Sequence, residues 1–406
     1  MEAQMNLMIK GGHLISGHRA DVLVRDGEIV AVGAVPAPEA TEVIDADGLV
    51  VAPGFVDGHR HVWQAPLRGT GADLSLPDYF TAVLGRALSA YGPREAHLAT
   101  LLGAAEALDA GITTVFDWSN TTRTPEHTDA VLDAYTAAGL RAVVAHGNPD
   151  DERDVRRLAD RSGRVTGALA ILGADYGPWD EAVRQIELGR ELGLVVSMHA
   201  GGGPGSALRR LHAAGLLGPH LQLVHVNAMT ADDAKLIADT GTGVTVTPVV
   251  EGTMGHGASA YSRFADAGGR AGLGTDVAVN APPDLFEPMR DTLRSHRAHT
   301  GTMYPAGGIL AAATADSAHA IGLGEAVGAV SAGKRADLIL LDGLTHLLGT
   351  AELAGAVVTS LGPANVHTVL VDGHIVKRDG RLVALNLAQL RAATAELSAH
   401  VLQDRS

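Results

Sequence analysis

Short apolar runs recur along the middle of the chain, and each has the length of one buried β-strand. Most neighbouring runs are separated by a segment with helical periodicity, such as residues 94–108 and 179–192. From the second run onward the starts lie about 23 to 30 residues apart, the length of one strand–helix unit with its loops. The eight runs cover residues 55–61, 113–118, 141–147, 166–173, 195–200, 221–226, 244–249 and 270–276. They predict an α/β fold with a closed (β/α)8 TIM barrel.

The interval after the first run is about twice as long as the others. The extra material falls in residues 62–92, directly after the first predicted strand. In a barrel this region overhangs the end that carries active sites. We therefore predict that it forms a lid over the substrate.

The two ends of the chain have a different sequence pattern, which predicts short strands bounded by Gly, Asp or Pro. The expected strands are residues 6–10, 20–25, 28–32 and 42–45 at one end and 336–341, 366–371 and 374–377 at the other. We predict that both ends join in one small β-sandwich domain, although two separate β appendages fit the same pattern. The expected division is 1–52 for the first half of this domain, 53–325 for the metal-dependent barrel, and 326–406 for the second half with a C-terminal helix.

Composition narrows the partners of the protein. A net charge of −15 argues against nucleic acid, because binding to phosphates needs clustered Lys and Arg. The absence of cysteine excludes disulfides, thiolate metal sites and cysteine nucleophiles. The sequence shows neither a secretory signal nor an apolar run of the ~18 residues needed to span a membrane. We expect a soluble cytoplasmic protein that acts on a small molecule; a homodimer is compatible, since barrels of this kind often pair.

Polar side chains stand at the predicted ends of the barrel strands, where barrel enzymes hold their active sites. Residues i and i+2 of a strand face the same side, so two histidines with this spacing can share one cation. Such a pair alone is weak evidence, because two solvated turn histidines give the same pattern. The residues are His59 and His61 on the first run, His199 on the fifth, His225 on the sixth and Asp276 on the eighth. Together they predict a metal site.

Several motifs resemble signatures of the amidohydrolase superfamily. The run PGFVDGHRH at residues 53–61 looks like its first-strand signature, and GLGTD at residues 272–276 looks like its eighth-strand signature. GKRADL at 333–338 and VLVDG at 369–373 are similar to the segment that returns to the small β domain. The branch it resembles most holds cytosine, guanine and adenosyl-type deaminases and triazine hydrolases. An HxxQ like that of guanine-deaminase-like members implies a substrate contact for Gln64, although a loop cap fits equally well.

The resemblance implies one divalent metal held by His59, His61, His199 and Asp276. Two-metal members use a bridging lysine at the fourth strand, and none of the four lysines here stands at the end of a barrel strand. The nitrogen and oxygen ligands suit zinc, while iron, manganese or nickel would also accept them. Such a cation makes a hydroxide nucleophile from bound water near neutral pH. The resemblance further implies that Asp276 takes the proton and that His225 polarises the attacked group; a core histidine is the alternative for His225.

One position departs from the deaminase pattern. Deaminases of this branch carry a glutamate three residues after the fifth-strand histidine, where this chain has Gly202. Glu251 lies just past the seventh strand, where the family usually has asparagine, and His256 is close to it in the sequence. We hypothesise that Glu251, with His256, replaces the missing proton carrier or binds a basic group of the substrate. A glutamate that only caps the next helix is the alternative. Trp63, in the predicted lid, is a further candidate substrate contact.

These features predict a metal-dependent hydrolase of a non-peptide carbon–nitrogen bond, in a heterocyclic amine or a cyclic amidine. The missing glutamate leaves dechlorination, ring opening and cyclodehydration at the same site as alternatives. A non-catalytic scaffold is a third interpretation, which the retention of every ligand position opposes. Weaker candidates at the same end of the barrel are Tyr79, Asp117, Trp118, His146, Asn148 and Asp175.

Overall fold

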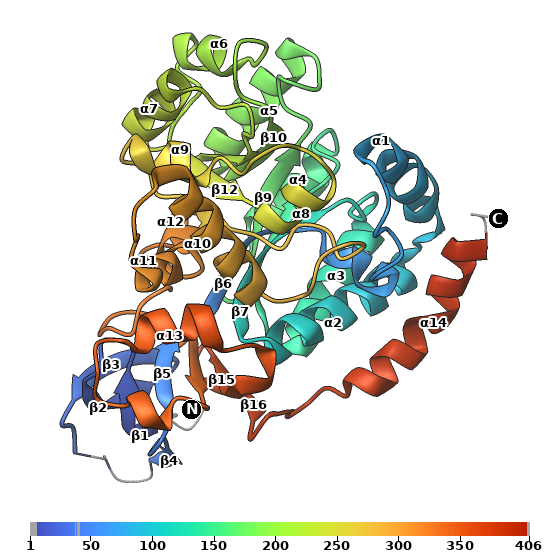
Figure 1. Cartoon of the computed structure of the whole chain (residues 1–406). Coiled ribbons are helices and arrows are strands. Elements are labelled where there is room, and N and C mark those ends of the chain that lie inside the picture. Colours follow the sequence, from blue (N-terminus) through green and yellow to red (C-terminus); the bar gives the residue numbers. More distant parts are fainter. Residues whose placement is uncertain (1–5, 37, 39–40, 404–406) are drawn as a thin grey trace.

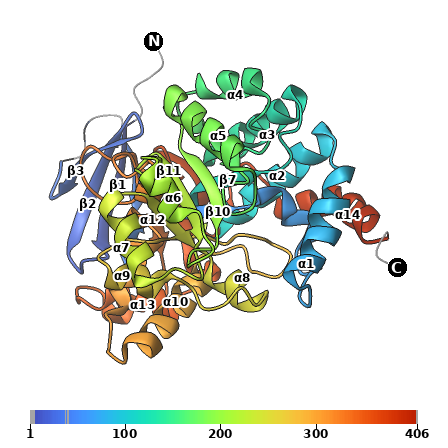
Figure 2. The same cartoon turned by 90° about the horizontal axis from the view of Figure 1, so that it is seen from above.

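Eight parallel strands form the centre of the computed structural model, which describes residues 6–36, 38 and 41–403. They lie side by side in chain order, and helices surround them (Figure 1, Figure 2). The strands are β6 (Phe55–Arg60), β7 (Ile112–Ser119), β8 (Arg141–His146), β9 (Val165–Ile171), β10 (Val196–Ala200), β11 (Leu221–His225), β12 (Gly243–Val246) and β13 (Gly272–Leu273). Each overlaps its predicted run, so the prediction of an eight-stranded α/β barrel is confirmed.

The last strand is the shortest, and hydrogen bonds beyond its end close the barrel. β13 contains only two residues, although the sequence pattern extended this strand to residue 276. The chain leaves strand geometry because Asp276 has a φ of 61°, in the left-handed region. The His61 N–H donates to the Asp276 carbonyl (2.9 Å), and the Asp276 N–H donates to the His59 carbonyl (2.9 Å). These bonds join the chain after β13 to β6 and complete the ring.

A buried carboxylate reinforces this closure. Asp57 of β6 is fully buried and accepts both the backbone N–H (3.0 Å) and the hydroxyl hydrogen (2.6 Å) of Thr275. Arg60 lies 3.8 Å from the same carboxylate. Burial raises the pKa of Asp57, and the charge of Arg60 opposes that rise. Asp57 therefore ties the first barrel strand to the residue before Asp276.

Two helices around the barrel show why the chain starts and stops a helix where it does. α7 begins at a capping box, in which the Thr230 side chain accepts the Asp233 N–H and the Asp233 side chain accepts the Thr230 N–H. α5 ends at Gly193, whose φ of 66° suits a residue without a Cβ. From residue 93 onward the α-helices are α2 (Pro93–Asp109), α3 (Pro125–Ala138), α4 (Glu152–Ala159), α5 (Trp179–Leu192), α6 (Leu208–Ala213), α7 (Ala231–Thr240), α8 (Pro248–Thr253), α9 (Tyr261–Asp266), α10 (Phe286–Thr300), α11 (Ala306–Ala312), α12 (Ala315–Ala320), α13 (Leu353–Ser360) and α14 (Leu387–Gln403).

Within the part of the chain that the structure describes, no helix is both long and apolar enough to cross a bilayer.

Residues 62–91, which we call the covering segment, lie over the C-terminal end of the barrel. They form a 3-10 turn (Val62–Leu67), α1 (Leu76–Tyr79), a π-helical turn (Phe80–Arg86) and a second 3-10 turn (Ala87–Ala90). Its apolar side chains pack against residues that follow β12 and β13, in a cluster that includes Trp63, Leu67, Tyr79, Val83, Tyr91, Val250, Met254, Val277 and Val279. Gly69 and Gly71 donate backbone hydrogen bonds to Ala278 (3.4 Å) and Val279 (2.9 Å). Its action as a lid remains a prediction.

Both ends of the chain join in one nine-stranded sheet, the chain-end sheet. The two halves meet where β14 pairs antiparallel with β5, so the ends are not separate appendages. The strands are β1 (Asn6–Leu14), β2 (Arg19–Arg25), β3 (Glu28–Gly33), β4 (Glu42–Asp45), β5 (Val50–Pro53), β14 (Leu338–Leu341), β15 (Val366–Val371), β16 (His374–Arg378) and β17 (Arg381–Leu382). A β-sandwich domain of its own, and the divisions at 52/53 and 325/326, remain predictions. The outer limits of the predicted domains, residues 1–5 and 404–406, lie outside the described residues.

The C-terminal helix α14 contacts both α2 and the covering segment. The Ser398 hydroxyl donates to the Pro66 carbonyl (2.7 Å). The buried Glu106 carboxylate of α2 pairs with Arg68 of the covering segment and with Arg391 of α14 (3.3 Å). Figure 2 places α14 on the side of the barrel away from the chain-end sheet. One carboxylate thus joins α2 and the covering segment that precedes it to α14, which is distant from both in the sequence.

Asp57→Ala is expected to lower the free energy of unfolding by about 3 kcal/mol, because it removes two charge-assisted hydrogen bonds and leaves the Thr275 donors buried without partners. Urea unfolding of metal-depleted protein measures the change. Asp47→Ala is the matched control, since it removes only the exposed ion pair with Arg19 (2.7 Å) and should cost less than about 1 kcal/mol. Equal effects of the two substitutions would contradict the role of Asp57.

Candidate metal centre

Three imidazoles and one carboxylate meet at the C-terminal end of the barrel. β6 brings His59, and His61 follows its last residue; their ring centres lie 5.0 Å apart. β10 supplies His199, whose ring centre is 5.0 Å from that of His59. Asp276 Oδ1 is 3.3 Å from His59 Nε2 and 3.6 Å from His61 Nε2. His225, at the end of β11, stands next to His199 with ring centres 5.3 Å apart. The structure therefore gathers all five residues expected from the strand ends.

Among the residues that the structure describes, two groups of three side chains could each hold a metal ion, and His59 belongs to both. One group adds His61 and Asp276, and the other adds His199 and His225. Within each group the ligand atoms lie within 4.8 Å of one another. The predicted four-ligand set spans the two groups and leaves His225 beside it. The assignment of those four residues as the ligands remains a prediction.

The chemistry of these donors fits a divalent cation. Both ring nitrogens of His59 are buried without a hydrogen-bond partner, which is costly unless a ligand satisfies them. Burial lowers the pKa of His61 to about 4 and that of His199 well below its ordinary value. Burial would raise the pKa of Asp276, but the neighbouring His59 and His225 lower it. Neutral imidazoles and an ionised carboxylate are the forms that bind metal.

Asn120 orients His61, and the sequence reasoning missed it. His61 Nδ1 donates to Asn120 Oδ1 (2.8 Å), which leaves Nε2 facing Asp276. The Trp63 indole N–H donates to the same oxygen (2.9 Å), and Trp63 is only 1% exposed. Trp63, a predicted substrate contact, is thus occupied in supporting the centre. Asn120 directly follows β7, so its place at a strand end was the signal available in the sequence.

Three of the six non-glycine residues with positive φ in the described part of the chain lie at the centre. His225, Val226 and Asp276 have φ angles of 72°, 46° and 61°. This backbone region is rarely occupied by residues with a side chain, least of all by β-branched ones, and such strain concentrates at functional sites. In this conformation His225 Nε2 lies 3.9 Å from Asp276 Oδ2.

Glu251 reaches the centre through His225. It lies in the first turn of α8, fully buried, with Oε1 3.3 Å from His225 Nδ1. The same oxygen accepts the Thr247 N–H (2.9 Å), so the alternative of a helix cap describes part of its role. The Thr247 hydroxyl lies 3.1 Å from His225 Nδ1 and donates to Asp276 Oδ2 (3.3 Å). Burial would lower the pKa of His225, but Glu251 and Asp276 raise it.

The other two predicted substrate contacts carry unpaired polar atoms. The His256 ring stands perpendicular to that of His225, with centres 5.5 Å apart, and its Nε2 is buried without a partner. Burial and the charge of His225 lower the pKa of His256. Gln64 is fully buried; its Nε2 donates to the Tyr79 hydroxyl (2.6 Å), and its Oε1 has no partner. A substrate could satisfy both atoms, which keeps these assignments as predictions.

The glycine at position 202 is required by the backbone. Gly202 has a φ of 74°, and a Cβ there would lie 2.7 Å from the Met229 nitrogen and 2.9 Å from its Cα. Such distances to backbone atoms are too short for any side chain. The glutamate of the deaminase pattern therefore cannot occupy this position without moving the loop.

Two of the weaker candidates, Trp118 and His146, have different surroundings. The Trp118 ring centre lies 4.1 Å from that of His199, so Trp118 forms one wall of the centre. His146 instead pairs with Asp154 (2.9 Å), whose carboxylate also accepts the Thr128 hydroxyl hydrogen (2.6 Å). All three of these residues are buried, and they connect β8 to helices α3 and α4. His146 therefore belongs to the packing around the barrel.

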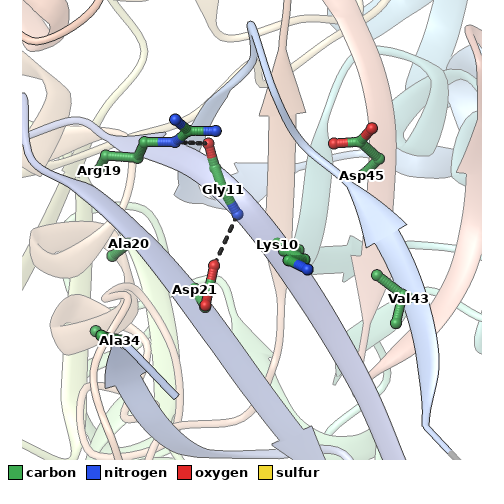
Figure 3. Close-up of a pocket in the computed structure, with 9 residues that line it drawn as sticks. Lys10, Gly11, Arg19, Ala20, Asp21, Ala34, Val43 and Asp45 are labelled. Atoms are coloured by element: carbon green, nitrogen blue, oxygen red, sulfur yellow. Dashed lines mark hydrogen bonds between the residues drawn. The ribbon is translucent and has the colours of Figure 1, made fainter. Parts of the chain in front are cut away.

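A cavity of about 550 Å³ lies elsewhere, on the chain-end sheet (Figure 3). Arg19 and Asp21 line it, and both are hydrogen-bonded to the backbone of Gly11. The full lining is Lys10, Gly11, Arg19, Ala20, Asp21, Gly33, Ala34, Val43 and Asp45. It contains no residue of the metal centre, so this cavity is separate from the chemistry described above.

Asn120→Ala is expected to weaken metal binding about 10- to 100-fold, because His61 loses the hydrogen bond that fixes its ring. Competition with a chelator for the bound metal measures the affinity. Asn148→Ala is the matched control, since Asn148 lies just past the neighbouring strand β8 and should leave the affinity unchanged. An unchanged affinity in Asn120→Ala would contradict an orienting role.

Known proteins with the same architecture can be aligned with almost the whole chain. The chain is 29% identical over 418 aligned residues to the 5-methylthioadenosine/S-adenosylhomocysteine deaminase of Desulforudis audaxviator, covering 94% of this chain and 96% of that protein. An adenosine deaminase from Xanthomonas campestris with bound zinc has a TM-score of 0.86 at 22% identity, covering 98% of this chain and 99% of the other. Atrazine chlorohydrolase from Arthrobacter aurescens TC1 complexed with zinc has a TM-score of 0.83 at 21% identity, covering 97% and 100%. The Amidohydrolase family model matches residues 50–376, and a match of this extent shows that the chain belongs to the amidohydrolase family.

Proposed function

We propose that this amidohydrolase releases ammonia from an amino-substituted heterocycle. As a family member with deaminase relatives, the chain is a metal-dependent, deaminase-like hydrolase of carbon–nitrogen bonds other than peptide bonds. The observation that carries the finer proposal is the convergence of His59, His61, His199 and Asp276 beside His225 at the active end of the barrel. Heterocyclic amines, of which the adenine nucleosides named for the relatives are examples, are the substrate class.

We propose one zinc ion per chain, held by His59, His61, His199 and Asp276. The mixed nitrogen and oxygen donors support zinc, although iron, manganese or nickel would also accept them. The lysines support a single metal because they lie away from the centre: Lys235, Lys334 and Lys377 pair with groups on α7, after α12 and at the end of α2, and Lys10 lies in β1 of the chain-end sheet. When bound, the cation lowers the pKa of a water ligand toward neutrality and supplies the nucleophile.

The side chains around this site have separate tasks in the proposal. Asp276 accepts the proton of the attacking water through a carboxylate whose lowered pKa keeps it ionised. His225 points Nε2 toward Asp276 and donates to the group under attack. Gln64 and His256 offer buried unpaired atoms to the substrate ring. Trp63 is a further proposed contact, although only 1% of its surface is exposed.

Glu251 serves the reaction through His225 in this proposal. Its Oε1 holds His225 Nδ1, so the opposite ring nitrogen is presented to the reacting groups. Gly202 leaves no room for a carboxylate after His199, so Glu251 with His225 takes the place of that missing proton carrier.

Dechlorination is the second candidate, because a chloride leaving group needs no proton. The backbone at Gly202 leaves no room for a proton-donating carboxylate, and this favours dechlorination. Ring opening, cyclodehydration and a non-catalytic scaffold have no observation of their own in their favour. A cytoplasmic location and a homodimer remain predictions.

Ammonia release from a panel of adenosine, 5-methylthioadenosine, guanine and cytosine tests the proposal. We expect one equivalent of ammonia per product from at least one compound, loss of activity after chelation, and recovery with zinc. Chloride release from a chlorotriazine, with no ammonia from the panel, would favour dechlorination instead. A protein that binds no metal and releases neither product would contradict both functions.

Glu251→Gln is expected to lower turnover by at least about 100-fold, because the amide cannot hold His225 as the carboxylate does. Metal content, measured on the same sample, should stay at one per chain. Glu187→Gln is the control, since Glu187 pairs with Arg190 (2.9 Å) on the surface of α5. Near-normal turnover in Glu251→Gln would remove Glu251 from the mechanism.

A further inference from the structure

Two exposed apolar side chains stand on one loop at the active end of the barrel. Leu172 and Tyr176, on the connection from β9 to α5, are 61% and 59% exposed. The large apolar side chains exposed in the described residues are Val43, Phe80, Leu172, Tyr176, Met303 and Val383. We infer that residues 172–177 form a substrate-binding rim that holds an apolar or aromatic group of the substrate away from the reacting carbon. This inference deepens the proposed function and rests on its placement of the active site.

The rim is held in one conformation by Asp175. Its carboxylate accepts the Gly201 N–H (2.8 Å), the Ala207 N–H (2.6 Å) and the Ser206 hydroxyl hydrogen (2.9 Å). The turn is closed by a hydrogen bond from the Gly177 N–H to the Gly173 carbonyl (2.8 Å). These bonds fix the backbone that carries Leu172 and Tyr176, and in this structure both side chains are exposed. Two exposed apolar side chains on a fixed loop at the active end of the barrel are available to an apolar group of a ligand.

The rim is continuous with the metal centre. Gly201 follows His199 by two residues, and a Cβ on Gly201 would lie 3.8 Å from the Tyr176 hydroxyl oxygen. Residues 201–203 are all glycine, so this loop places no side chain between Tyr176 and His199. Beyond His199 lies the Trp118 ring, 4.1 Å away between centres. A flat group extending from the reacting ring along this loop would meet Tyr176.

The size of this surface identifies the occupant as part of the substrate. Stable protein–protein interfaces bury on the order of 1,200 Å² or more, which two side chains on one loop cannot supply. An aromatic or apolar group of a small molecule needs only one such ring and one aliphatic neighbour. The tyrosine ring provides the stacking face, and Leu172 provides an apolar edge.

Binding of imidazole and 4-phenylimidazole to the zinc-loaded protein tests the rim. Both probes bind metal through the same azole nitrogen, so the difference between them isolates the contribution of the phenyl group. We expect the wild type to bind the phenyl compound about three- to tenfold more tightly, the value of one aromatic contact, as measured by titration calorimetry. Tyr176→Ala should lose this preference, and Tyr176→Phe should keep it because the ring remains.

Val383→Ala is the matched control, since Val383 is 62% exposed and follows β17 in the chain-end sheet. It should retain the full preference. A preference that persists in Tyr176→Ala, or that is absent from the wild type, would overturn the rim. Ammonia is not measured here, so failure of the deamination assay with an intact phenyl preference would reject the reaction and not the rim.

Discussion

The hydrogen bonds between Asp57 and Thr275 are the constraint on which the rest of the centre depends. A barrel whose last strand has two residues has few ladder bonds with which to close. A buried carboxylate that accepts two hydrogen bonds provides the missing connection at that point. The same junction carries His59 and His61 on one side and Asp276 on the other. The hydrogen bonds that close the barrel therefore also set the positions of these metal-binding candidates.

Around this junction, two of the histidines are fixed by neighbours of different kinds. Asn120 fixes His61 by an amide oxygen, and Glu251 fixes His225 by a carboxylate. Thr247 contacts both His225 and Asp276, so it couples the two sides of the site. The carboxylate that supports His225 comes from α8, whereas the loop after β10 has a backbone that excludes one. In our proposal, the departure from the deaminase pattern moves the carboxylate from the loop after β10 to α8, and the strand ends that hold the metal ligands are unchanged.

The sequence predicted the barrel well because buried parallel strands read as separate apolar runs at a regular interval. It missed β5, which runs directly into the first barrel strand, and it extended the seventh and eighth strands too far. Pro248 begins a helix where an apolar run continues, and Asp276 leaves the strand through a left-handed conformation. The five strand-end residues were found because their position follows from topology. Asn120 was missed, although its place directly after β7 was a signal in the sequence. Its hydrogen bonds to His61 and to the Trp63 indole could not be predicted, because partners distant in sequence meet only after folding.

Glu106 pairs with both Arg68 and Arg391, and so it connects helix α14 to the segment that covers the barrel. Arg68 belongs to the segment above the centre, whereas Arg391 belongs to the last helix, and both depend on the same anion. Loss of α14 by proteolytic trimming would leave that anion with a single counter-charge and free the Pro66 carbonyl. Helix α14 is thus a support of the covering segment, although it lies outside the metal centre.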